Sequence, residues 1–341
     1  MTTVLAAALA SDPAAITALA ADIVRGVELT AAQARELLDV QPGPCQDALL
    51  AGARAIREAF LGRNVKCCSI LNVKAGNCSE NCSYCAQASG STADTYQKSK
   101  WLPDEDILGA ADSAAANGAG ALGLVAAWKG VKEGSQLDMV CEAVEKLSQH
   151  GTVRADVTLG ILDSQTCADR LKKAGAKVYG HNIETARSFY NSICTSHSFE
   201  DRMKTIGFIK QAGMGLCSGG IIGMGENKDQ RIEFFEQLRF IQPDMIPMNF
   251  LNPLKGTKLE HIPVMAADEA LVTLAVARWF LPDRNLMVAG GKEVVFGDRL
   301  SEVLQSGINA LMVGNYLTSV GTPAQFWQDA CAQADLALVP E

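Results

Sequence analysis

Three cysteines within eight residues constrain this chain more than any other feature of its sequence. They are Cys78, Cys82 and Cys85, and they have the spacing C-x3-C-x2-C in a short polar stretch. Thiolates this close together are typical metal ligands, but three of them are one short of a closed tetrahedral zinc site. On a four-iron cluster the same three would leave one iron without a protein ligand, where a substrate or cosubstrate could bind. The spacing therefore favours a cluster that takes part in chemistry.

Two other metal sites compete with this interpretation. A zinc knuckle would need a fourth ligand, and no further Cys or His lies nearby in the sequence. An electron-transfer cluster of ferredoxin type usually has a fourth Cys in the same tight run, which this stretch lacks. Both alternatives are weaker than a catalytic cluster.

The chain has eleven cysteines in 341 residues. A disulfide framework belongs to small secreted domains, so metal ligation better explains some of these thiols. Cys45, Cys141, Cys167 and Cys331 are scattered along apparent helices, where we expect small, mostly buried apolar side chains.

Charge and hydropathy exclude several other classes of protein. The net charge is −8, and no basic patch of the kind that binds nucleic acid stands out. No apolar run is long enough to span a bilayer, and residues 1–25 lack the layout of a signal peptide. We therefore expect a cytoplasmic protein without a nucleic-acid or membrane partner.

From Val65 onward, short apolar runs alternate with amphipathic stretches of helical period. Such alternation favours a parallel sheet, and eight units in about 250 residues predict a (β/α)8 barrel. A doubly wound sheet is the alternative. The candidate strands lie near 67–73, 120–126, 153–159, 177–182, 215–222, 244–249, 286–289 and 309–313.

The barrel is expected to span residues 61–320, between an N-terminal helical segment (1–60) and a C-terminal tail (321–341). Thr30 and Gln33 resemble a capping box that opens one of the N-terminal helices. Barrel enzymes carry their active site at the C-terminal ends of the strands. Because the first strand ends near Lys74, the three-cysteine loop should lie at this catalytic mouth.

The loop resembles that of the radical S-adenosylmethionine (SAM) enzymes, and Tyr84 matches the aromatic position of their motif. The resemblance implies a [4Fe-4S] cluster whose open iron chelates the amino and carboxylate groups of SAM. An electron from the cluster then cleaves SAM to methionine and a 5′-deoxyadenosyl radical. Gly219 and Gly220 look suited to close approach of the backbone to this cosubstrate, with a structural turn as the alternative.

Further segments resemble the biotin synthases, and the resemblance runs from about residue 20 to 325. It implies sulfur insertion between C6 and C9 of dethiobiotin, with sulfur from an auxiliary iron–sulfur cluster inside the barrel. It also implies a reductant such as flavodoxin or ferredoxin, and a homodimer. The matching segments are 126–129, 180–185, 217–226, 247–251, 255–257 and 289–293.

The resemblance assigns roles to four polar residues. Asn182 and Glu184 end the fourth strand, where the family hydrogen-bonds the SAM ribose and the ureido ring of the substrate. The family more often has Asp at the position of Glu184. Arg202 matches an Arg that pairs with the SAM carboxylate, and Asn249 matches a residue that holds the ureido ring.

The chain departs from the family at the auxiliary cluster. Better-known members hold a [2Fe-2S] cluster with three Cys and one Arg, and here Cys217 alone remains of those cysteines. The other two positions fall on Gly123 and Asp156, and Lys292 takes the position of the Arg. Glycine offers no thiolate, and Lys is a compact ammonium rather than a planar fork, so that cluster cannot form in the same way. Either Asp156 or Lys292 could contact a cluster of another kind.

Other cysteines suggest a replacement. We prefer Cys68 to Cys67 as the residue that faces the barrel interior, because the face of the first strand that carries Cys68 also carries the polar Asn72 near the mouth. The hypothesis is that Cys68, Cys194 and Cys217 hold a four-iron auxiliary cluster instead of a [2Fe-2S] cluster, as proposed for a second class of biotin synthases. The alternative is that Cys68 and Cys194 are ordinary buried thiols.

Two other functions remain open at this point. One is another barrel-type radical SAM enzyme, such as a hydrogenase-cluster maturase or a lysine-mutase-like enzyme of pyrrolysine synthesis. The other is a non-catalytic iron–sulfur carrier. Reductive SAM cleavage separates them, because a carrier should form no 5′-deoxyadenosine and a maturase should not form it in response to dethiobiotin.

Overall fold

The computed structural model describes residues 9–314 and 321–341, and its centre is a closed parallel barrel. β10 pairs with both β9 and β11, and β11 pairs with β1, which closes the sheet. The predicted barrel is confirmed, with the fifth strand divided into two short pieces, β7 and β8. The strands are β1 (Asn64–Lys74), β2 (Ala121–Ala126), β4 (Arg154–Thr158), β6 (Val178–Gly180), β7 (Gly215–Cys217), β8 (Gly220–Ile222), β9 (Met245–Phe250), β10 (Asn285–Val288) and β11 (Ala310–Met312).

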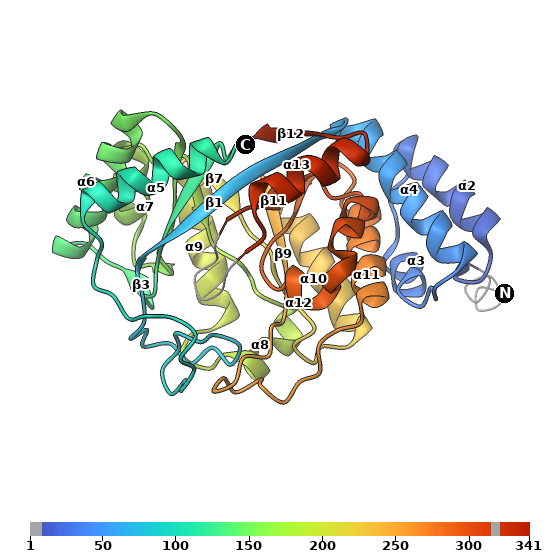
Figure 1. Ribbon diagram of the computed structural model, residues 1–341. Helices are drawn as coiled ribbons and strands as arrows, with labels where there is room; N and C mark the ends of the chain where they lie inside the picture. Colours follow the sequence, from blue (N-terminus) through green and yellow to red (C-terminus); the bar gives the residue numbers. More distant parts are fainter. Residues whose placement is uncertain (1–8, 315–320) are drawn as a thin grey trace.

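Helices follow the strands and cover the outside of the barrel (Figure 1). Their apolar faces pack on the sheet; Cys141 and Cys167 are buried on two of them, as expected. No helix in the described part of the chain is long and apolar enough to cross a bilayer. The covering helices are α5 (Asp104–Ala116), α6 (Ser135–His150), α7 (Gln165–Ala174), α8 (Arg187–Ile193), α9 (Phe199–Gln211), α10 (Lys228–Ile241), α11 (Ala267–Phe280), α12 (Lys292–Phe296) and the 3-10 helix η1 (Gly297–Ser306). A small separate sheet joins β3 (Gly130–Val131) and β5 (Ile161–Leu162).

The N-terminal helices α2 (Pro13–Val24), α3 (Ala31–Leu37) and α4 (Pro44–Leu61) pack beside α11, at the right of Figure 1. Thr30 and Gln33 form the predicted capping box. At the interface, Gly52 lies under Trp279, where a Cβ would stand 2.3 Å from a ring carbon. The indole of Trp279 also donates a hydrogen bond to the carbonyl of Leu49, at 3.1 Å. Close packing and this bond fix the helical segment to the barrel.

The C-terminal tail consists of α13 (Ala324–Gln333) and β12 (Ala337–Pro340), and β12 adds a parallel strand to the start of β1. The expected boundary of this tail near residue 320 lies outside the described residues. In Figure 1 the tail is at the top, where the strands begin, and the loops that follow the strands are at the bottom. We call the first end the floor of the barrel and the second its mouth.

Candidate active site

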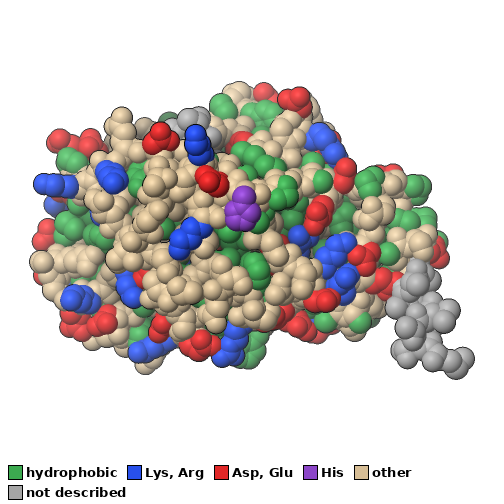
Figure 2. All heavy atoms as spheres, turned by 90° about the horizontal axis from the view of Figure 1, so that it is seen from below, with side chains coloured by type: hydrophobic (Ala, Val, Ile, Leu, Met, Phe, Trp, Pro, Cys, Tyr) green, Lys and Arg blue, Asp and Glu red, His purple; other side chains and the backbone are tan. Residues whose placement is uncertain are grey.

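A cavity of about 340 Å³ lies inside the barrel and joins the three-cysteine loop to the interior of the strands. An adjoining cavity of about 280 Å³ opens beside it toward β9 and β10. At the mouth, the larger cavity is lined by Cys78, Cys82, Tyr84, Cys85, Asn182, Glu184, Arg202 and Asn249. Deeper inside, its lining includes Cys68, Gly123, Asp156, Cys217, Met287 and Met312. Figure 2 shows the mouth face from outside, with cations interspersed among acids.

The cysteine loop is held by the segment between α8 and α9. The side-chain oxygen of Asn81 accepts hydrogen bonds from the backbone N–H groups of Thr195 (3.0 Å) and Ser196 (3.2 Å). The backbone N–H of Asn81 donates to the Ser196 hydroxyl at 3.0 Å. The N–H of Ser83 donates to the carbonyl of Ile193 at 2.8 Å. These bonds hold the loop against the segment between α8 and α9.

The donor atoms of the loop fit a four-iron cluster with one open iron. Cys78, Cys82 and Cys85 carry free thiols on one cavity. Burial raises the pKa of Cys78, and it raises the pKa of Cys85 to about 11. The metal-free thiols therefore keep their protons, which a metal would displace on binding.

Asn182, Glu184 and Arg202 meet beside this loop. The guanidinium of Arg202 donates to the backbone carbonyl of Asn182 at 2.9 Å and lies 3.6 Å from the carboxylate of Glu184. Burial opposes its charge, but Glu184 and the hydroxyls of Tyr84 and Tyr190 outweigh burial and raise its pKa. Arg202 is thus a buried, permanent cation facing the cavity, suited to pair with a carboxylate.

Asn249 lines both cavities, and part of its amide is already engaged. Its oxygen accepts from the N–H of Gly290 at 2.9 Å, and its NH2 group donates to the carbonyl of Gly220 at 3.1 Å. The NH2 group also donates a longer hydrogen bond to the carbonyl of Pro247, at 3.5 Å, so one lone pair of the oxygen remains for a ligand.

His181 is a functional candidate that sequence reasoning passed over. It is buried on the cavity wall, and its Nε2 has no hydrogen-bond partner. Burial, and then the charge of Arg202, lower its pKa, so the ring is neutral. The sequence signal was present, since this histidine lies in the matching segment 180–185 immediately before Asn182.

The structure gives Gly219 and Gly220 a different role from the one expected. A Cβ on Gly219 would lie 2.1 Å from the carbonyl oxygen of Pro247, and one on Gly220 would lie 2.2 Å from that of Glu184. Neither glycine is part of the lining of the two cavities. Close packing of neighbouring strand backbones is enough to require glycine at both positions, and the approach of a cosubstrate stays a prediction.

Toward the floor, Cys68 and Cys217 share an apolar cluster with methionines of β9, β10 and β11. The sulfur of Cys68 lies 3.8 Å from that of Met287. The strand-parity argument is confirmed, because Cys68 lines the cavity and Cys67 packs in the outer core. Burial raises the pKa of both Cys68 and Cys217 far above the usual range of a thiol.

Asp156 and Glu341 bring negative charge to this part of the wall. Arg154 donates three hydrogen bonds to the carboxylate of Asp156, at 2.9, 3.2 and 2.7 Å, and also pairs with Glu341 at 2.9 Å. Burial dominates and raises the pKa of Asp156 to about 6. Glu341 reaches this position because β12 pairs with β1.

Lys292 is not part of the cavity lining, although it was expected as a possible partner of the auxiliary cluster. It is buried on α12, and its ammonium donates to the carbonyls of Ala289 (3.3 Å) and Met312 (3.2 Å). The residue that β10 presents to the cavity is Met287. Sequence reasoning missed Met287 because a methionine in an apolar run resembles ordinary core.

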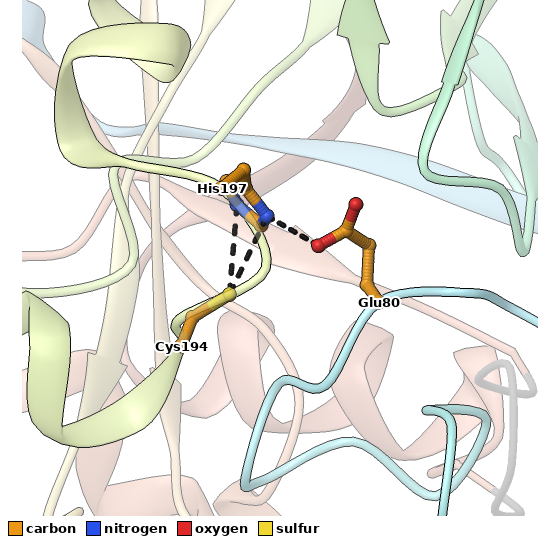
Figure 3. Close-up of side chains that lie close together, drawn as sticks. All are labelled: Glu80, Cys194 and His197. Carbon is orange, nitrogen blue, oxygen red and sulfur yellow. Dashed lines mark hydrogen bonds and ion pairs between the residues drawn. The ribbon is translucent and has the colours of Figure 1, made fainter.

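Cys194 does not join Cys68 and Cys217, which corrects the expected ligand set. It follows α8 at the mouth, where its sulfur lies 3.8 Å from that of Cys82 and 3.4 Å from Nδ1 of His197 (Figure 3). The hydrogen bond that Cys82 donates lowers the pKa of Cys194 to about 3. Burial opposes this shift, and His197 adds to it. The same bond and burial raise the pKa of Cys82.

Comparison with known proteins decides the family. Residues 73–238 match the radical SAM superfamily, and residues 247–336 match the biotin and thiamin synthesis associated domain. A biotin synthase of Pelobacter propionicus is 39% identical over 95% of this chain and 97% of its own length. One of Geobacter sulfurreducens is 39% identical over 94% of this chain and 96% of its own length. The chain belongs to the biotin synthase family.

Solved structures show how widely the fold of this biotin synthase family member is shared. Methylornithine synthase (PylB) superposes with a TM-score of 0.82 at 18% identity, covering 94% of this chain and 97% of that one. The hydrogenase maturase HydG gives a TM-score of 0.78 at 17% identity, covering 96% and 77%. At these identities the likeness establishes the barrel alone. Full-length similarity to biotin synthases therefore sets aside the maturase, mutase and carrier alternatives, and implies a four-iron cluster and SAM as cofactors.

Proposed function

We propose that this protein converts dethiobiotin to biotin by inserting sulfur at C6 and C9. The supporting observation is the continuous cavity, which has the three-cysteine loop at its mouth and two further cysteines toward its floor. A substrate between them would have a radical source on one side and a sulfur source on the other. When bound to Cys78, Cys82 and Cys85, the four-iron cluster would supply the electron that cleaves SAM.

The polar residues at the mouth would bind and orient the two small molecules. Arg202 is a charged partner for the SAM carboxylate, and Asn182 and Glu184 offer donors and acceptors to its ribose and to the ureido ring. Asn249 keeps one acceptor lone pair for the same ring, and its longer bond to Pro247 could be exchanged for a ligand. His181 presents a neutral nitrogen to the cavity and can add one directional hydrogen bond.

Cys68 and Cys217 would hold the auxiliary cluster, with Asp156 and Met287 as the adjacent groups that could contact it. The prediction of a four-iron rather than a [2Fe-2S] cluster rests on the changed positions Gly123 and Asp156. Burial raises the pKa of Asp156 to about 6, which still leaves the carboxylate mostly ionised at neutral pH, so Asp156 is available as an oxygen ligand.

The deciding experiment is an anaerobic assay with SAM, dethiobiotin and a reductant such as reduced flavodoxin or ferredoxin. Formation of 5′-deoxyadenosine that increases with dethiobiotin, together with biotin, supports the proposal. If the rate of SAM cleavage does not change with dethiobiotin and no biotin forms, the proposed substrate is wrong, although the radical chemistry still holds. A homodimer in the cytoplasm remains a prediction, to be checked by light scattering and cell fractionation.

A further inference from the structure

A second group of potential metal ligands lies where the cysteine loop meets the segment between α8 and α9. Glu80, Cys194 and His197 are all buried, and their potential ligand atoms lie within 4.8 Å of one another (Figure 3). They come from two segments that the hydrogen bonds of Asn81 hold together. The function proposed above uses none of these three residues.

We propose that Glu80, Cys194 and His197 form a binding site for one Zn²⁺ ion, which Cys82 completes when the four-iron cluster is absent. Thiolate, imidazole and carboxylate are the ligands that zinc takes in proteins, and four of them satisfy its tetrahedral preference. The three-cysteine loop contributes Glu80 and Cys82 to this set, and the segment after α8 contributes Cys194 and His197.

Two of the distances between ligand atoms match those of a zinc tetrahedron. Bonds of about 2.3 Å to sulfur and about 2.0 Å to nitrogen put two ligand sulfurs about 3.8 Å apart, and a sulfur and a nitrogen about 3.5 Å apart. The observed distances are 3.8 Å from Cys82 to Cys194 and 3.4 Å from Cys194 to Nδ1 of His197. Glu80 now accepts a hydrogen bond of 2.5 Å from that nitrogen. The ion would replace this proton, and the carboxylate would move back by about 1 Å.

One tautomer of His197 would leave Nδ1 free for a metal. Its Nε2 lies 2.7 Å from the hydroxyl oxygen of Tyr190. If Nε2–H donates to that oxygen, Nδ1 keeps its lone pair for the metal, which is the usual arrangement behind a ligating histidine. Lys129 lies 3.5 Å from the second carboxylate oxygen of Glu80 and offsets part of the negative charge of two thiolates and one carboxylate.

Shared use of Cys82 gives the site a consequence. A thiolate bound to zinc in this site is not available to the cluster, so zinc and cluster loading exclude each other at Cys82. In cluster-free protein, bound zinc would hold the three-cysteine loop in place. It would also keep the Cys82 thiolate from other reactions until iron and sulfide are supplied. This inference does not depend on sulfur insertion, since it concerns cluster-free protein.

Cobalt(II) is the probe for the test, because it follows zinc geometry and reports its ligands by absorption. The full chain is made cluster-free with a chelator and carries Cys78→Ala and Cys85→Ala, which removes the loop as a competing three-sulfur site. We expect one cobalt per chain, with intense visible bands of a tetrahedral ion, a thiolate-to-cobalt charge-transfer band and displacement by zinc. Adding Cys194→Ala should weaken binding by at least about 100-fold, and Tyr190→Phe by about 10-fold.

The control is Cys167→Ala, which removes a buried thiol of α7 and should leave the cobalt spectrum unchanged. If the Cys194→Ala protein does not fold, X-ray absorption of the double variant replaces it, with two sulfur and two nitrogen or oxygen neighbours as the expected shell. A double variant that binds no cobalt, or one whose cobalt affinity and charge-transfer intensity are unchanged by Cys194→Ala, would overturn the proposal. Both readouts are independent of activity, so failure of the proposed function would leave them untouched.

Discussion

The mouth and the floor of this barrel both gather sulfur, but they do so by different means. At the mouth, three cysteines come from one short loop, and backbone hydrogen bonds fix that loop. At the floor, Cys68 and Cys217 come from separate strands and meet because the barrel closes. Burial raises the thiol pKa at both ends, so a metal at either site must displace tightly held protons. The mouth is thus a local site, and the floor is a product of the whole fold.

Removing a mouth ligand is the strongest way to separate the two regions. We expect Cys78→Ala to lower 5′-deoxyadenosine formation by at least about 100-fold, because loss of a direct ligand costs at least as much as loss of its support. The floor should keep its own iron, because its ligands lie on other strands. Iron and sulfide counts together with the cleavage assay test this. Complete loss of iron in this variant would contradict the independence of the two sites.

Cys217→Ala tests the opposite separation. Biotin formation should stop, while reductive cleavage of SAM continues within about threefold of the unchanged protein, since the mouth is intact. Cys167→Ala, a buried thiol of the outer core, is the matched control and should change neither product. Equal loss of both products after Cys217→Ala would show that the floor also supports the mouth.

Much of this comparison was visible in the sequence, and what was missed has a common physical cause. The spacing of Cys78, Cys82 and Cys85 and the period of the strands are short-range patterns, so the mouth and the barrel could be predicted. Cys194 was assigned to the wrong end because its partner, Cys82, lies 112 positions away along the chain. Met287 was missed for a related reason, as its role depends on which strand lies opposite Cys68.

The apolar part of the floor can be tested through Met287. In cluster-free protein, Met287→Ala should lower the free energy of unfolding by about 2–5 kcal/mol, because it opens a cavity beside Cys68. Met287→Leu keeps the volume and should cost less than about 1.5 kcal/mol. Denaturant titration of both variants measures this. Equal costs would mean that the sulfur itself, and not the packed volume, stabilises the floor.

The smallest expected effect concerns the charge of Asp156. Its pKa is about 6 in the folded protein and 3.8 ordinarily, so between these values the folded state binds the proton more tightly. The stability contributed by protonation is complete below about pH 4 and is lost as pH rises through 6. Asp156→Asn cannot titrate, so its free energy of unfolding should fall less steeply over this window in cluster-free protein. Asp39→Asn is a control whose pKa shift has the opposite sign. Burial raises the pKa of Asp39, but hydrogen bonds from Lys228 and Arg35 together outweigh burial and lower it, so the stability that Asp39 contributes is lost as pH falls. Parallel pH profiles for Asp156→Asn and the unchanged protein would mean that the pairing with Arg154 cancels the cost of burying the carboxylate. The floor would then carry no net penalty for the charge of Asp156.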